Sequence, residues 1–248
     1  MKMAFSTDNS LSLLPYLLEF RRRLFYSAAV IAIFFVIFCI FSNELYHSLA
    51  LPLLKYLPYH SKMIAINLTA PLVVPLKLAA AAAIMVSIPF ILYQLWKFIT
   101  PALYQQERRL AWFLLSLSTG LFYLGMVFAY FIILPLTFRF LIGLAPPDVT
   151  VMPDIDHYLS MVYQLFFAFG ASFEVPLLIL VLVWTGMVNL QTLAAKRPYF
   201  IVGSFIAGMI FTPPDVISQI SLAIPLCLLF EAGVLLAHIY PRRQKNPQ

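Results

Sequence analysis

The sequence predicts an all-α polytopic membrane protein with six transmembrane helices, both termini in the cytoplasm, and short last two spans. Of its 248 residues, 62% are hydrophobic and only 10% are charged, and its mean hydropathy is +0.92. Soluble domains have a charged fraction of about one quarter. The apolar residues also form runs, most of which are long enough to cross a hydrocarbon layer of roughly 30 Å as a helix.

The first apolar run could be a span or part of a secretory signal peptide. It follows an arginine cluster, but it exceeds the roughly 7 to 15 apolar residues of a signal peptide, and no small-residue cleavage site follows it. We therefore expect a retained span. A single integral membrane domain over residues 1–248 is predicted, with spans at about residues 24–42, 74–96, 111–134, 158–184, 199–211 and 216–240.

Proline and small residues mark the second to fourth spans. The second contains the alanine run 79–83 and Pro89. Small residues allow close helix contact in lipid, and a membrane proline usually kinks a helix rather than ending it. The third span has Pro135 near its end, and the fourth holds Glu174, followed closely by Pro176.

The last two spans differ from the others. The apolar stretch 199–211 has only thirteen residues, which at about 1.5 Å per residue gives roughly 20 Å and falls short of the bilayer. A polar turn leads back into the sixth run, which Gln219, Pro225 and Glu231 interrupt. Such elements must thin the membrane, tilt their neighbours or form a re-entrant hairpin.

The distribution of basic residues predicts the orientation. Six spans with a cytoplasmic N-terminus leave only four bases on the outer side, namely Lys55, Lys62, Lys77 and Arg139. The other twelve of the sixteen lie inside, and the positive-inside rule favours this arrangement. They are Lys2, Arg21, Arg22, Arg23, Lys97, Arg108, Arg109, Lys196, Arg197, Arg242, Arg243 and Lys245.

Composition and motifs argue against several classes of function. The net charge of +6 comes from short clusters of bases between apolar runs. Such clusters orient a polytopic protein in the membrane, so we expect no nucleic acid partner. Spacing marks no Ser-His-acid set and no phosphate-binding glycine loop, so we expect no enzyme and no cofactor. The isolated histidines and the cysteines Cys39 and Cys227 lack ligand spacing, so no metal site is expected.

Two glutamates are expected at the cytoplasmic face. Glu19 precedes three arginines, and Glu107, in the charged segment 98–110, precedes two more. A carboxylate accepts both donors of a guanidinium fork, so two carboxylates at one face can hold two arginines of a peptide. The alternative is a solvated charge cluster, in which Glu19 pairs with Arg22 or Arg23, one helical turn on, and Glu107 pairs with Arg108.

Glu174 is expected inside the membrane. It lies about ten residues before the cytoplasmic end of the fourth span, at a depth of roughly 15 Å. An ionisable group there is a functional hypothesis by default. It could line a water-filled cavity or contact a partner, and the alternative is a protonated carboxyl group hydrogen-bonded to a neighbouring helix.

Five segments carry a resemblance to a known family. They are LLEFRRRL at 17–24, FITPALYQQERRL at 98–110, FAFGASFEVP at 167–176, KRPYF at 196–200 and TPPDVISQ at 212–219. Together they resemble TatC, the polytopic receptor component of the twin-arginine protein translocase. The resemblance spans nearly the whole chain in order, and five motifs in register are a specific signal.

The resemblance implies a multi-pass protein of the bacterial inner membrane that binds twin-arginine signal peptides of folded proteins. It also implies the single-span partners TatA and TatB, a hetero-oligomer with several copies, and the proton-motive force as the source of energy. Its motifs imply a signal-peptide-binding patch with Glu107 as the principal acceptor, Glu19 beside it, and Phe98, Pro101 and Arg21 in the same patch.

Four further residues acquire roles through the resemblance. Glu174 would be the buried polar residue that faces the concave side of the helix assembly. Pro52 would lie in the first outer loop, and Asp215 and Gln219 would belong to the outer hairpin and the start of the sixth span.

Two other classes of function compete with this interpretation. A proton-coupled small-solute transporter would use Glu174 as the proton carrier and predicts substrate uptake by this chain alone. No internal repeat is evident, which counts mildly against the inverted-repeat transporters. A purely structural membrane scaffold predicts that Glu19 and Glu107 can be replaced without loss of peptide binding.

Overall fold

The computed structural model describes residues 9–42, 44–45, 64–99, 108–144, 146, 152–211 and 216–239. This part of the chain is almost entirely helical. Its elements are α1 (Asn9–Ile40), α3 (Ala70–Ile99), α4 (Arg108–Phe128), the π-helical turn η2 (Ala129–Ile133), α5 (Leu134–Gly143), α6 (Ile155–Phe173), α7 (Val175–Thr185), α8 (Leu190–Ala195), α9 (Arg197–Phe211) and α10 (Val216–Ile239).

Five helical segments in the described ranges are long and apolar enough to cross a membrane. They are Leu18–Ile40, Ala70–Phe98, Trp112–Gly143, Ile155–Thr185 and Gln219–Ile239, and the shorter apolar helix α9 adds to them. The all-α polytopic fold predicted from the sequence is confirmed. Of the last two spans, α9 is short, with 15 residues, whereas α10 has 24 residues and is long enough to cross.

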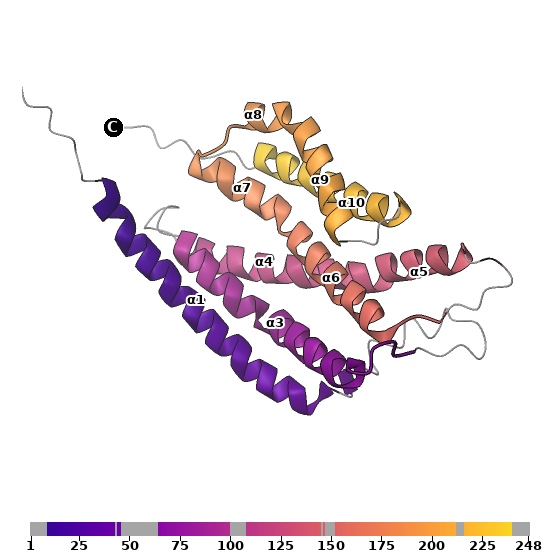
Figure 1. Ribbon diagram of the computed structural model, residues 1–248. Helices are drawn as coiled ribbons and strands as arrows, with labels where there is room; N and C mark the ends of the chain where they lie inside the picture. Colours follow the sequence, from indigo (N-terminus) through magenta and orange to yellow (C-terminus); the bar gives the residue numbers. More distant parts are fainter. Residues whose placement is uncertain are drawn as a thin grey trace, which may run out of the picture.

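The helices run back and forth between two ends of the molecule (Figure 1). The start of α1, the end of α3, the start of α4, α8 and the end of α10 lie toward one end, at the upper left of the view. The clustered bases of α1 and Lys97 of α3 belong to these segments, and Arg197 begins α9 two residues after the end of α8. This is therefore the end that the positive-inside rule assigns to the cytoplasm.

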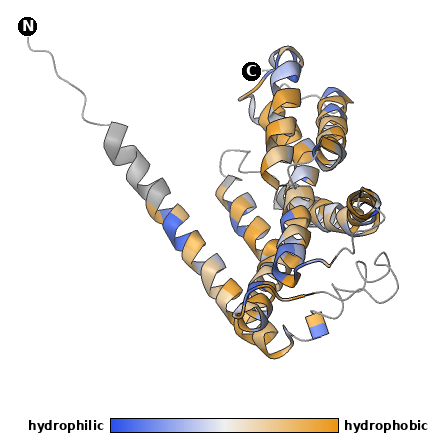
Figure 2. Cartoon of the chain, turned by 45° about the vertical axis from the view of Figure 1, so that its right-hand side comes forward, coloured by the Kyte–Doolittle hydropathy of each residue, from blue (hydrophilic) through white to orange (hydrophobic). Residues whose placement is uncertain are grey.

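α1 lies at the edge of the bundle and packs along α3 (Figure 1). Figure 2 shows it with apolar residues over most of its described length and a polar segment near the cytoplasmic end. Most of its large apolar side chains are exposed, among them Phe25, Ile33 and Ile40. These side chains face lipid when the helix spans a membrane, since hydrocarbon is as apolar as they are.

Pro89 leaves a gap in the hydrogen bonding of α3, and a residue of α4 fills it. α3 continues as one helix through Pro89, but proline has no N–H group to donate to the carbonyl of Met85 one turn earlier. The Tyr123 hydroxyl donates to that oxygen at 3.1 Å. Tyr123 therefore satisfies the freed carbonyl and joins α4 to α3.

Two other prolines coincide with changes of helix geometry. The π-helical turn η2 lies directly before α5, whose first turn contains Pro135. In the fourth span, Glu174 separates α6 from α7, and Pro176 lies in the first turn of α7. The predicted span 158–184 therefore consists of two successive helices, with Glu174 between them and a proline in the first turn of the second.

Glycines allow the helices to cross closely. A Cβ atom at Gly125 of α4 would lie 2.5 Å from the carbonyl oxygen of Phe169 in α6, and one at Gly208 of α9 would lie 2.9 Å from Cγ of Gln219 in α10. Helices in lipid associate through van der Waals packing, which small residues improve by letting backbones approach. The α4–α6 crossing therefore depends on the absence of a side chain at Gly125.

Gly125→Ala should destabilise the bundle by about 1–3 kcal/mol, because the added methyl group must push α4 away from α6. Gly120→Ala is the matched control, since a Cβ atom at Gly120 of the same helix meets nothing within 4 Å. There the better helix propensity of alanine should preserve or raise stability. Thermal unfolding of the purified proteins in detergent measures both, and equal stabilities would contradict this crossing.

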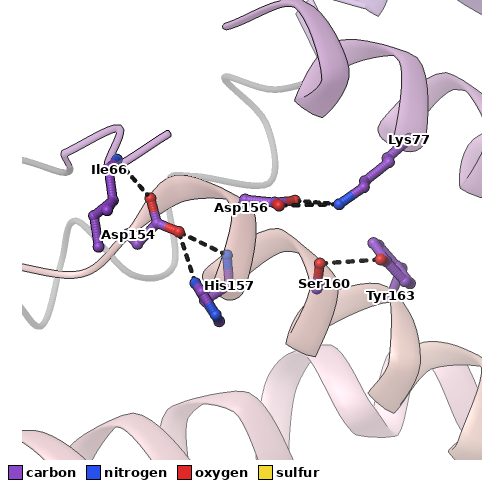
Figure 3. A network of polar contacts seen from close by, with 7 residues as sticks. All are labelled: Ile66, Lys77, Asp154, Asp156, His157, Ser160 and Tyr163. Atoms are coloured by element: carbon purple, nitrogen blue, oxygen red, sulfur yellow. Dashed lines mark hydrogen bonds and ion pairs between the residues drawn. The ribbon is translucent and has the colours of Figure 1, made fainter. Parts of the chain in front are cut away.

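At the outer end, a short segment before α3 is attached to the start of α6 (Figure 3). Ile155 donates its N–H to the carbonyl of Ile64 at 3.0 Å. The Asp154 side chain, only 5% exposed, accepts from the Ile66 N–H at 3.2 Å and from the His157 N–H at 3.4 Å. It also lies 2.7 Å from His157 Nδ1, so Asp154 both caps α6 and holds the incoming chain.

α3 is attached at the same place. Lys77 Nζ lies 2.7 and 2.9 Å from the two carboxylate oxygens of Asp156 in the first turn of α6. The hydrogen bond from the His157 side chain, with the backbone N–H of Ile66 acting in the same direction, holds the pKa of Asp154 below its ordinary value. The outer ends of α3 and α6 are thus joined by two neighbouring carboxylates.

The Asp154 contacts should be lost in acid. A carboxyl group whose pKa is lowered by folding stabilises the fold above its unfolded pKa of about 3.9, and it loses that contribution as the pH falls through the folded value. We expect protection of the Ile66 amide against hydrogen exchange to be constant between about pH 7 and about pH 5, and to fall below about pH 4. Asp154→Ala should lack this protection throughout, and protection that survives in the variant would refute the assignment.

Candidate functional site

Glu19 lies near the cytoplasmic end of α1 and is held by another residue of the same helix. Its side chain is 44% exposed and forms an ion pair with Arg23, one turn along. Arg23 Nε donates to Glu19 Oε1 at 3.1 Å, and Nη2 donates to the same oxygen. Arg23 Nη1 donates to the backbone and side-chain oxygens of Gln94 in α3 at 3.4 and 3.3 Å. Glu19 is therefore paired with an arginine of its own helix, and this arginine is in turn hydrogen-bonded to α3.

Phe98 lies beside this ion pair at the end of α3. Its ring centroid is 5.9 Å from that of Phe20, the residue after Glu19, and the two rings are tilted by 60°. Arg21, also in this turn of α1, is exposed. Of the predicted patch, the structure thus places Phe98 against the turn of α1 that carries Glu19 and Arg21.

The other predicted residues of the patch are Glu107 and Pro101, and both lie outside the described residues, as do Pro52 and Asp215. Their roles stay predictions. The described chain resumes at Arg108, the first residue of α4. The start of α4 lies toward the same end of the molecule as the start of α1 (Figure 1).

Glu174 lies at the break between α6 and α7, and the residue is 8% exposed. Ser118 Oγ of α4 donates to Glu174 Oε2 at 2.7 Å. The other oxygen, Oε1, is buried and has no hydrogen-bond partner within the described part of the chain. Hydrocarbon offers no hydrogen-bond donors, so the hydroxyl of Ser118 supplies the carboxyl group with a donor that lipid could not provide. Glu174 is thus hydrogen-bonded to a neighbouring helix and keeps one oxygen for a further donor.

Gln219 connects the two helices of the last hairpin. Its Nε2 donates to the carbonyl oxygen of Phe205 at 2.9 Å, which ties the start of α10 to α9. Toward the cytoplasmic end of the same pair of helices, Arg197 and Glu231 form an ion pair of 2.8 Å. The side-chain amide of Gln219 therefore binds α9 and holds it against α10.

Sequence reasoning missed Ser118, which binds Glu174, and Gln94, which binds Arg23, the arginine paired with Glu19. Each is an uncharged polar residue within an apolar run, and that is the only signal the sequence carries. A run of letters does not reveal which residue of another helix such a side chain meets. The structure supplies that information, since Ser118 faces Glu174 and Gln94 faces Arg23.

These contacts are suited to binding rather than to covalent chemistry. An exposed carboxylate beside an aromatic pair can bind a cationic peptide at the membrane face, and a buried carboxyl group at a helix break can bind a polar group of another helix. No group of three or more His, Cys, Asp or Glu residues that could hold a metal ion occurs in the described ranges.

The fold and these two polar centres define a polytopic helical membrane protein with an exposed, ion-paired carboxylate toward one end and a buried carboxyl group within a span. Residues 15–225 match the family model of the Sec-independent protein translocase protein (TatC). The TatC protein of Haemophilus influenzae is 48% identical over 235 residues, covering 95% of this chain and 92% of its own length. That of Escherichia coli K12 is 46% identical over 241 residues, with coverage of 97% and 93%. The chain belongs to the TatC family.

A solved structure agrees with this assignment. The crystal structure of a twin arginine translocase receptor, TatC, superposes with a TM-score of 0.83 and is 40% identical, covering 90% of this chain and 98% of that one. The protein is therefore a component of the Sec-independent, or Tat, protein translocase of the inner membrane. It is a transport protein and works in a complex with other Tat subunits.

Ser118→Ala should destabilise the protein by about 1–3 kcal/mol, because it removes the donor to a buried carboxyl group. Ser116→Ala is the matched control, since Ser116 is exposed and donates to the Trp112 carbonyl of its own helix. Glu174→Gln should cost less than Ser118→Ala, because its amide oxygen can still accept from Ser118. Unfolding in detergent measures all three, and indistinguishable serine variants would speak against the contact.

Proposed function

We propose that this protein is the receptor subunit of the twin-arginine translocase. It binds twin-arginine signal peptides of folded precursor proteins at its cytoplasmic face. With TatA and TatB, in a hetero-oligomer of several copies, it exports these precursors using the proton-motive force. Glu107 and Glu19 accept the guanidinium groups of the signal peptide, and Phe98, Pro101 and Arg21 shape the same patch.

The fixed and exposed carboxylate of Glu19 is the observation that carries this proposal. Glu19 remains 44% exposed although it is bonded to Arg23, and Arg23 is in turn bonded to Gln94 of α3. A side chain already ordered in this way loses little conformational entropy when a ligand binds. A guanidinium group needs such an oriented acceptor more than an ammonium group does.

The aromatic pair beside Glu19 supports a peptide as the ligand. The rings of Phe20 and Phe98 pack together, and Phe20 is 51% exposed. An exposed ring next to a carboxylate offers apolar contact to the residues that flank an arginine. The relative solved at 40% identity is described as a twin arginine translocase receptor, which supports the same ligand.

Glu174 is proposed to contact a partner span. Its Oε1 is buried without a partner among the described residues, so a polar side chain of an incoming helix would satisfy it. Asp215 and Gln219 at the outer hairpin, and Pro52 in the first outer loop, are proposed to maintain the arrangement that the partners recognise. This assignment makes Glu174 a binding residue rather than a proton carrier.

Glu107→Ala and Glu19→Ala should each weaken binding of a twin-arginine precursor about tenfold or more, since a hydrogen bond to a charged group contributes about 1.5–3 kcal/mol. Changing the arginine pair of the precursor to lysines should have a similar effect, because an ammonium group cannot form the fork. Site-specific crosslinking of the precursor to this protein in membrane vesicles measures both.

The matched control is Glu231→Ala. Glu231 is also a carboxylate toward the cytoplasmic end, its side chain is also 44% exposed, and it also pairs with an arginine, Arg197. The Glu231→Ala variant should leave crosslinking of the precursor unchanged. If crosslinking is the same in the Glu107 and Glu19 variants and with the lysine precursor as in the wild type, the proposed receptor function is rejected. Solute uptake by this chain alone, abolished by Glu174→Gln, would identify the competing transporter.

A further inference from the structure

We infer that Arg23 is a specificity-determining residue of the signal-peptide site, which makes Glu19 select a guanidinium group over an ammonium group. This inference rests on the proposed function and adds a residue to it. The guanidinium group of Arg23 already occupies one oxygen of Glu19 in the free protein. An incoming arginine therefore meets a carboxylate whose charge is already paired.

The geometry fixes Arg23 in this position. Its side chain is 13% exposed, against 44% for Glu19. Its Nη1 donates to two oxygen atoms of Gln94 in α3, while Nε and Nη2 both donate to Glu19 Oε1. Release of Arg23 would break contacts on two helices at once. Arg23 is thus a fixed part of the site, and Glu19 Oε2 is the oxygen left for a further donor among the described residues.

The charge balance then decides which ligand binds well. A bare carboxylate attracts any cation through its net charge, and a compact, strongly hydrated ammonium group benefits from that attraction as much as a guanidinium group does. The pair of Glu19 and Arg23 is neutral overall. What remains is Oε2, a directional acceptor that can take two N–H groups of one guanidinium group, as Oε1 does from Arg23. This geometry favours the planar and weakly hydrated fork of arginine. Arg23 therefore acts against the wrong ligand more than it favours the right one.

Arg22, the neighbouring base, does not share this role. It donates to the Tyr26 hydroxyl at 3.1 Å, and its guanidinium carbon lies 5.5 Å from the centroid of the Tyr26 ring. It carries the same charge on the same helix without bonding to Glu19. Arg22→Gln therefore has the same effect on net charge as Arg23→Gln and is the matched control.

The test measures binding of two synthetic signal peptides, one with an arginine pair and one with a lysine pair, to the purified full-length protein in nanodiscs. For Arg23→Gln we expect the preference for the arginine peptide to fall at least about threefold, mainly because the lysine peptide binds more tightly. Arg22→Gln should keep the wild-type ratio. Arg23→Lys restores the paired charge and should keep most of the preference.

The possible results separate the two levels of the argument. If the wild-type protein binds neither peptide, or both equally, the receptor function itself fails. If the wild-type protein prefers the arginine peptide but Arg23→Gln keeps that ratio, or Arg22→Gln lowers it equally, only the role of Arg23 is rejected. Should Arg23→Gln fail to fold, Arg23→Lys decides, because loss of the preference in that variant would overturn the charge-pairing explanation.

Discussion

Hydrocarbon supplies no hydrogen-bond partners, so each polar group inside the bilayer must find one within the protein. The buried hydroxyls follow this rule locally. Ser87 donates to the carbonyl of Ala83 one turn earlier, and Ser172 donates to that of Ala168. Where proline removes a donor, another helix replaces it, as Tyr123 does for Met85. Other connections between helices are made by polar side chains, as by Gln219 with Phe205 and by Lys77 with Asp156.

The same constraint distinguishes structural polar groups from those available for binding. A serine hydroxyl that donates to its own helix has used its one O–H donor within that helix. Glu174 differs, because Ser118 satisfies one carboxyl oxygen and the other is buried without a partner in the described ranges. Glu19 differs in another way, because it is exposed yet oriented by Arg23. A group that the fold positions without fully satisfying it is suited to receive a ligand.

The sequence predicted the fold better than it predicted the contacts of the site. Long apolar runs and the placement of bases are visible in the order of residues along the chain, so the polytopic helical fold could be predicted from them. The break at Glu174 could not be predicted from its proline. A helix continues through Pro89 in α3, whereas Pro176 lies in the first turn of a new helix. Of the partners of Glu19 and Glu174, only the one on the same helix could be predicted. Arg23 lies on the same helix and was foreseen as a candidate, but Ser118 lies 56 residues from Glu174.

The short helix α9 shows how the bundle affects its surroundings. Its 15 residues span about 22 Å at about 1.5 Å per residue, well below a hydrocarbon thickness of about 30 Å. Tilting would shorten its reach further, so tilt relieves a long helix and not a short one. α9 is also fixed to α10 by the Gln219 contact with Phe205, the stacked rings of Phe200 and Phe230, and the ion pair of Arg197 with Glu231. α10 itself packs against α7. Because tilt would not lengthen the reach of α9, its mismatch with the hydrocarbon layer is accommodated by thinning of the bilayer, by flanking residues that extend to the interface, or by association with other helices.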